Sequence, residues 1–414
     1  MSHQTSVVCV AESKVPRLIA ALTSGMRYPV VELQSDEAAV AIEDAHPAAV
    51  ILADPEPSPA LAAELIRRIA ALEGAYVPVL GHVANGAAVG PAMQPVLPIP
   101  GDAPPWRLIA RLTSALRIRA LHAAVRRRAG ASHADAVPAP GSHREATVLV
   151  AGRGGGYPAL SMAVGEHVGL VGALSFETAQ RYLDARDIDG VVIGDGFSLR
   201  LVEAFLATLG ADVRFRDLPV VIADSRLGNV DLAALPNAEH VRGGPDAVLA
   251  RLLPLVQVHA FASRLKRRMR TLDTKGFVDA ETGLLTCDAF MHDLMQAVQD
   301  AASRKGPLSL ARFVFPRIDR HASIDAARIV SRLVRATDFA CQDDDGAIHV
   351  AFGDTDLKAA HVVARRIASV LKHTMLVPDP DAPRLDPDVA LVTRKASDTA
   401  ESLLARVHPA VAAQ

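Results

Sequence analysis

The first 273 residues repeat one pattern, in which short apolar runs rich in β-branched residues alternate with amphipathic stretches. Such runs predict buried parallel strands at 7–11, 28–33, 48–53, 76–81 and 95–99. The same order recurs in the runs at 146–152, 168–174, 189–195, 217–224 and 239–243. Strands that alternate with helices assemble into a sheet with helices on both faces. The repeat therefore predicts two doubly wound α/β domains with parallel sheets.

The remainder of the chain has a different rhythm of elements. Residues 274–414 predict an α+β domain with a mixed central sheet, including a hairpin at 339–352 with Asp and Gly at its turn. The stretch 130–145 is rich in Gly, Ala, Pro and Ser and is typical of a linker. The sequence thus predicts three domains, at 1–129, 146–273 and 274–414.

Composition excludes several function classes. The 44 basic and 46 acidic residues leave a net charge of −2, so no overall basic field favours nucleic acid. Eleven Phe, four Tyr and one Trp are few for a base-stacking surface. No apolar run reaches membrane-spanning length, and the first residues do not resemble a secretory signal. Three widely spaced cysteines fit a reducing compartment, so we expect a cytoplasmic protein without a metal site or membrane span.

The third strand of each repeat ends in an aspartate, Asp54 in the first and Asp195 in the second. This arrangement resembles response-regulator receiver domains, which have a flavodoxin-like fold and in which that Asp accepts a phosphoryl group. Receiver chemistry also needs an acidic pair that holds Mg²⁺ and a Lys that contacts the phosphate. The first repeat offers only Glu12, and the second has glycines in place of the acids. Both repeats resemble degenerate receivers, with Asp54 as a candidate phosphoacceptor; alternatively, each Asp caps the following turn.

The segment 279–290, DAETGLLTCDAF, resembles the opening of GGDEF domains, the diguanylate cyclases. Two receiver-like units before such a domain is the layout of PleD-type regulators. When the hairpin is aligned by Asp338, the five signature positions read Asp-Asp-Gly-Ala-Ile at 344–348. Acids replace the glycines, the signature carboxylates are missing, and the metal position near 314–316 has no carboxylate. The resemblance therefore implies a pseudoenzyme without cyclase activity and without a cofactor.

One further motif of the family is retained. Arg335 and Asp338 form an R-x-x-D five residues before the signature positions, where GGDEF domains bind cyclic di-GMP at an inhibitory site. Arg can donate two hydrogen bonds to guanine O6 and N7, and Asp can accept from the N1–H and N2–H₂ edge. Arg366 falls on the family's further ligand-contacting Arg. The alternative is a solvated salt bridge between Arg335 and Asp338 at a helix end.

The resemblance implies a cyclic di-GMP-binding effector of the bacterial cell cycle, acting as a homodimer in the cytoplasm at a cell pole. Its partners would be protease adaptor proteins and the substrate that they deliver to the ClpXP protease. A ligand-independent scaffold of receiver-like and GGDEF-like domains is the alternative function.

Overall fold

The computed structural model describes residues 6–12, 14–26, 28–45, 47–53, 59–72, 74–81, 95–99, 104–129, 137–141, 145–272, 276–304, 306–315, 319–335, 338–374 and 385–408. The chain divides into two compact units. The N-terminal unit comprises Ser6–Arg119 and Pro138–Leu265, and the C-terminal unit includes Ala120–Val137 and Lys266–Gln414. The three domains at 1–129, 146–273 and 274–414, and the linker at 130–145, stay predictions.

The first sheet of the N-terminal unit is wholly parallel among its described strands, in the order β2-β1-β3-β4-β5. Its strands are β1 (Val7–Ala11), β2 (Val30–Gln34), β3 (Ala49–Leu52), β4 (Val79–Gly81) and β5 (Val96–Pro98). Helices α2 (Ser35–Ala45) and α3 (Pro59–Ala71) pack on one face through Ile42 and Leu65. Helices α1 (Pro16–Gly25) and α4 (Pro105–Ala129) cover the other through Leu22 and Leu112.

The second sheet repeats this arrangement with the order β7-β6-β8-β9-β10, again parallel. Its strands are β6 (Thr147–Ala151), β7 (Gly169–Ala173), β8 (Gly190–Ile193), β9 (Val220–Ile222) and β10 (Ala238–His240). Helices α5 (Tyr157–Gly165) and α8 (Pro245–Leu272) pack on one face, and α6 (Phe176–Ala185) and α7 (Leu199–Ala211) on the other. In both sheets the strand order by sequence is 2-1-3-4-5, the flavodoxin-like order, which confirms two doubly wound parallel sheets.

The two sheets share helices and hydrogen bonds within the N-terminal unit. Leu255 and Val258 of α8 belong to the core of the first sheet. The fully buried Arg111 of α4 bonds to Glu239 Oε1 at 2.5 Å and to the carbonyl of Pro98 at 2.6 Å. Arg251 of α8 in turn donates to the carbonyl of Ile99 at 3.2 Å. Arg111 and Arg251 stand at the same position counted from the prolines that begin α4 and α8.

Helix α8 also meets the length and composition of a membrane span, yet 56% of the relevant window is buried in the structure. Val248, Leu252 and Val256 pack on the second sheet, while Leu255 and Val258 pack on the first. Its apolar character is therefore explained by contact with two sheet cores.

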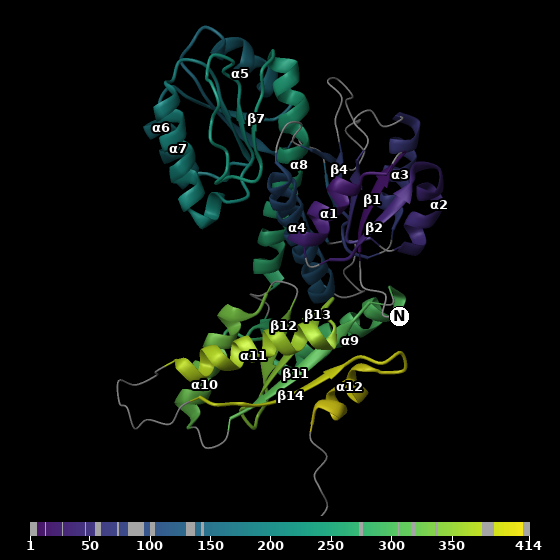
Figure 1. The fold of residues 1–414 in the computed structure, drawn as a ribbon. Helices are drawn as coiled ribbons and strands as arrows, with labels where there is room; N and C mark the ends of the chain where they lie inside the picture. The colour runs from purple at the N-terminus through teal and green to yellow at the C-terminus, as the bar shows by residue number, and fades with distance from the viewer. Residues whose placement is uncertain are drawn as a thin grey trace, which may run out of the picture. The chain divides into compact units, whose positions relative to one another are not determined.

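The C-terminal unit contains a sheet with the order β12-β13-β11-β14 (Figure 1). The strands are β11 (Leu308–Val314), β12 (Phe339–Gln342), β13 (Ile348–Gly353) and β14 (Asp388–Thr393). Helices α10 (Arg320–Leu333) and α11 (Leu357–His373) pack on one face, and α9 (Cys287–Ser303) and α12 (Ala400–Val407) on the other. From β11 to β14 the chain follows the split β-α-β-β-α-β motif.

The expected mixed sheet is wrong for these four strands, because all three ladders between them are antiparallel. Strand β13 lies between β11 and β12, which point the same way but do not pair with each other. The tight connection from β12 to β13 requires these two strands to pair antiparallel. Strand β13 also pairs antiparallel with β11 on its other side. Among the described residues, parallel pairing in this unit is limited to the bridge between Leu285 and Cys341.

Candidate functional site

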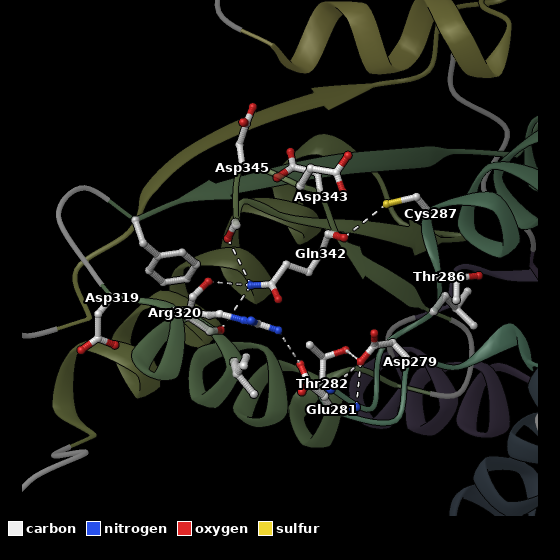
Figure 2. Close-up of a pocket in the computed structure, with 16 residues that line it drawn as sticks. Asp279, Glu281, Thr282, Thr286, Cys287, Asp319, Arg320, Gln342, Asp343 and Asp345 are labelled. Carbon is white, nitrogen blue, oxygen red and sulfur yellow. Dashed lines mark hydrogen bonds and ion pairs between the residues drawn. The ribbon is translucent and has the colours of Figure 1, made fainter.

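A cavity of about 590 Å³ lies in the C-terminal unit beside the β12–β13 hairpin. Its walls come from the segment before α9, the start of α10 and the hairpin turn (Figure 2). The charged residues that line it are Asp279, Glu281, Asp319, Arg320, Asp343, Asp344 and Asp345. Six carboxylates thus face one guanidinium, so the described lining is strongly acidic.

The Asp279 carboxylate organises the loop that leads into α9. Its Oδ1 accepts hydrogen bonds from the backbone N–H groups of Glu281 and Thr282, both at 2.8 Å, and from the Thr282 hydroxyl at 3.0 Å. The bond from the Thr282 backbone, with those other donors, holds the pKa of Asp279 below its usual range. Gly283 follows with a φ of +70°, a conformation that favours glycine. The Asp and Thr-Gly of the segment therefore form a closed turn.

The hairpin turn is fixed by Asp343, the first of three consecutive acids. Its N–H donates to the carbonyl of Ala347 at 2.9 Å, and its Oδ1 accepts from the Ala347 N–H at 2.8 Å. Its Oδ2 lies 3.1 Å from His349 Nε2 and 3.8 Å from Arg312 Nη2. Burial lowers the pKa of His349, which favours the neutral imidazole. Asp344 and Asp345 are exposed at the tip of the turn.

The remaining charged groups of the cavity also have local roles. Asp319 is the N-cap of α10, and its Oδ1 accepts from the Ala322 N–H at 2.8 Å. Arg320 Nη2 lies 3.3 Å from Glu281 Oε2, so the cavity's guanidinium is already paired (Figure 2). No group of three or more metal-ligating side chains occurs among the described residues. The acids of the cavity are thus spread out as caps and turns.

Comparison with known proteins finds no matching family model and no matching curated protein. Among solved structures, the chain is similar to the coiled coil and GGDEF domain of DgcB from Caulobacter crescentus in complex with c-di-GMP. That match has 17% identity and a TM-score of 0.30, and covers 36% of this chain and 85% of the other. A sensory box/GGDEF family protein from Caulobacter crescentus CB15 matches at 21% identity and TM-score 0.27, covering 32% and 92%.

Arg335 and Asp338 lie in the connection from α10 to β12. The side chain of Arg335 is exposed, whereas Asp338 is 9% exposed at the start of the sheet. The N–H of Asp338 donates to the carbonyl of Arg335 at 3.0 Å, so a backbone hydrogen bond joins the two motif residues. Arg366 is exposed on α11, the helix that packs beside α10 on the same sheet face (Figure 1). That Arg335, Asp338 and Arg366 bind a ligand stays a prediction.

Of the two aspartates that follow the third strands, one lies among the described residues. Asp54, the candidate phosphoacceptor, lies outside the described residues. Asp195 is bonded to the glycine-rich loop after β6: its carbonyl accepts from the N–H groups of Arg153 and Gly154 at 3.1 and 3.0 Å. Its Oδ2 accepts from the Gly156 N–H at 3.2 Å, and a Cβ built on Gly154 would stand 2.2 Å from the carboxylate. The Asp195 carboxylate therefore caps this loop.

Reasoning from sequence missed Glu281, Asp319 and Arg320 as members of the cavity. A signal for Asp319 exists, because an Asp immediately before a helical segment is typical of an N-cap. Their convergence with the hairpin depends on how β13 inserts between β11 and β12, which the linear spacing does not encode.

Proposed function

We propose that this chain is a cyclic di-GMP-binding effector of bacterial signalling that has no diguanylate cyclase activity. The turn from α10 to β12 carries the proposal, because it joins exposed Arg335 to Asp338 through a backbone hydrogen bond of 3.0 Å. A guanine can receive two donors from Arg335 and offer its N1–H and N2–H₂ edge to the carboxylate. Arg366, exposed on the neighbouring helix, would contact a second base.

The acidic cavity supports the absence of cyclase activity. A nucleoside triphosphate would meet six carboxylates and one guanidinium that is already paired with Glu281. Repulsion of this kind is strong where water is partly excluded. Three of the carboxylates, those of Asp279, Asp319 and Asp343, already accept hydrogen bonds from backbone N–H groups. The described residues of the lining therefore offer neither a phosphate cradle nor a metal cluster of the kind that condensation of two GTP molecules needs.

The wider role rests on the resemblance to receiver–receiver–GGDEF regulators, and within them to PopA, which combines a degenerate signature with an intact R-x-x-D. On this proposal the flavodoxin-like sheets are degenerate receivers that provide docking and homodimer surfaces. Cyclic di-GMP binding then changes which surfaces the chain displays to protease adaptors and to the ClpXP substrate. The protein would act in the cytoplasm at a cell pole.

Calorimetric titration of the full chain with cyclic di-GMP tests the binding site. A bidentate Arg–guanine contact contributes roughly 1–3 kcal/mol, so Arg335→Ala should weaken binding by about ten- to a hundredfold. Arg332→Ala is the matched control, because Arg332 is an exposed arginine of the last turn of α10 and stands outside the motif. Equal affinity in wild type and Arg335→Ala would contradict the assignment.

The alternative, a scaffold without a ligand, makes a different prediction for the same titration. If the wild-type chain shows no heat of binding at micromolar ligand, the scaffold function is favoured. Incubation of the full chain with GTP and Mg²⁺ tests the enzyme question separately, and we expect no cyclic di-GMP in the products. Any turnover above a protein-free control would overturn the pseudoenzyme assignment.

A further inference from the structure

Two cysteines far apart in sequence meet at the edge of the acidic cavity. Cys287 is the first residue of α9, and Cys341 lies in β12. The backbone brings them together, because Leu285, two residues before Cys287, forms a parallel bridge with Cys341. The Cys287 thiol donates to the carbonyl oxygen of Gln342, the residue next to Cys341, at 3.2 Å. The two thiols also lie close enough to influence each other's pKa. Figure 2 shows the Cys287 side chain pointing to Gln342.

The two thiols differ in access to solvent. Cys287 is exposed and lines the cavity, whereas Cys341 is 3% exposed within the sheet. A reagent in solution therefore reaches Cys287 first, and Cys341 is placed to react only with a group already bound to Cys287. This is the arrangement of an attacking thiol and a resolving thiol.

The acidic surroundings of Cys287 favour reaction with positively charged reagents. Partial burial raises the pKa of Cys287, and the nearby carboxylates of Asp344, Asp343 and Asp288 raise it further. Burial likewise raises the pKa of Cys341. A positively charged reagent is attracted to this environment and a negatively charged one is repelled, provided that salt does not screen the charges.

We propose that Cys287 and Cys341 form a modification site that is converted to an intramolecular disulfide by low-molecular-weight disulfides, cationic ones in preference to anionic ones. In the first step the Cys287 thiolate attacks one sulfur of the reagent, forms a mixed disulfide and releases one reagent thiol. In the second step Cys341 attacks the Cys287 sulfur, loses its proton and releases the second reagent thiol. The two protein thiols are oxidised, and the reagent disulfide accepts both electrons.

The new disulfide would join the first residue of α9 to β12, the first strand of the hairpin. It would close a loop that contains the whole of β11 and α10, and a long closed loop restricts the unfolded chain strongly. Since raised pKa values make thiolates scarce and poor leaving groups, both formation and reduction of this disulfide are slow. Once formed, the disulfide therefore persists beside the cavity.

Treatment of the full native chain with cystamine, a cationic disulfide, at about pH 8 tests the site, since the thiolate is the nucleophile. After denaturation, the wild type should retain one of its three thiols, and its intact mass should fall by two hydrogens. Peptide mapping should then recover a disulfide between the peptides containing Cys287 and Cys341. Oxidised glutathione, which is anionic, should react on the order of tenfold more slowly at low salt, with the difference lost in concentrated salt.

Three variants separate the steps. Cys341→Ala should stop at the mixed disulfide, with one cysteamine bound at residue 287. Cys287→Ala should keep both of its thiols, because Cys341 is buried. Cys9→Ala removes a buried cysteine of β1 and should still lose two thiols. Wild type that keeps all three thiols, or that ends as a cysteamine adduct at Cys287 with Cys341 unreacted, would overturn the proposal.

Discussion

Several carboxylates in the C-terminal unit accept hydrogen bonds from the backbone. Asp279, Asp319 and Asp343 each accept one or more backbone N–H groups at 2.8 Å. Each of these carboxylates replaces water as the partner of amide groups that a turn or helix start would leave unpaired. These three acidic residues of the cavity are therefore fixed in place, and the charge that they bring is a consequence of their roles in caps and turns.

Asp279→Ala should lower the free energy of unfolding by about 0.5–2 kcal/mol, the range for loss of a capping side chain. The pKa of Asp279 is lowered in the folded chain, so its contribution is present above the unfolded pKa of about 3.9. The contribution is lost as the pH falls through the lower, folded pKa. Urea unfolding of wild type and variant at neutral pH and at about pH 3 should show the difference shrinking.

Asp344→Ala is the matched control for that measurement, since Asp344 is exposed at the hairpin tip. Its effect should stay within about 0.5 kcal/mol at both pH values. An Asp279→Ala variant as stable as Asp344→Ala at neutral pH would contradict the capping role.

Among the elements, the hairpin from β12 to β13 determines which side chains positions 346 to 348 can hold. Gly346 has a φ of +80°, and a Cβ built there would stand 3.0 Å from Ser323 Oγ of α10. Ala347 is 2% exposed and Ile348 is fully buried in the sheet. A carboxylate at 346 would need a strained backbone, and one at 347 would be buried without a metal. The hairpin therefore disfavours a carboxylate at either position.

Gly346→Ala should destabilise the chain by about 1–2 kcal/mol, because an L-residue pays that cost in the left-handed region. Gly228→Ala is a suitable comparison, since a Cβ built at Gly228 meets nothing within 4 Å. Thermal unfolding of the two variants and wild type measures the effect. Similar melting temperatures for both variants would show that the turn relaxes without strain.

Apolar periodicity located most elements, including the hairpin, whose strands and Asp-Gly turn are confirmed. It missed α12, because only Ala400, Leu403 and Val407 are buried in that short helix and its capping box pairs Thr399 with Ser402 in place of the usual Glu or Gln. The start of α10 is hard to locate by apolar periodicity, since the first turn after Asp319 is polar. Strand pairing in the C-terminal sheet could not be predicted, because the order depends on where the chain crosses over.

At the scale of the whole molecule, one buried ion pair connects the two parallel sheets of the N-terminal unit. The Arg111 side chain is 0% exposed and that of Glu239 is 9% exposed, with their charged atoms 2.5 Å apart. Arg111 also bonds to the carbonyls of Pro98 and Pro236. A pair with this burial and these additional bonds holds its two elements in a defined geometry, and the loss of one partner leaves the other charge buried.

Arg111→Ala should therefore cost about 3–5 kcal/mol of stability, measured by chemical denaturation. Arg117→Ala on the same helix is the control, because Arg117 and Asp217 form a pair with 50% and 36% of their side chains exposed. Its cost should be at most about 1 kcal/mol. The double variant Arg111→Met with Glu239→Leu should recover most of the loss, since it removes both charges together. Equal effects of Arg111→Ala and Arg117→Ala would contradict this account.

Helix α8 gives this chain a practical constraint on how it can be divided. Because Leu255 and Val258 complete the core of the first sheet, an expression fragment that stops before residue 245 would leave apolar surface of that sheet in contact with water. The smallest piece that keeps both cores closed runs through α8, so a cut between residues 130 and 145 would separate two sheets that share a helix. Deletion studies that assign a partner to one repeat alone would then measure the loss of a core as well as the loss of a binding surface.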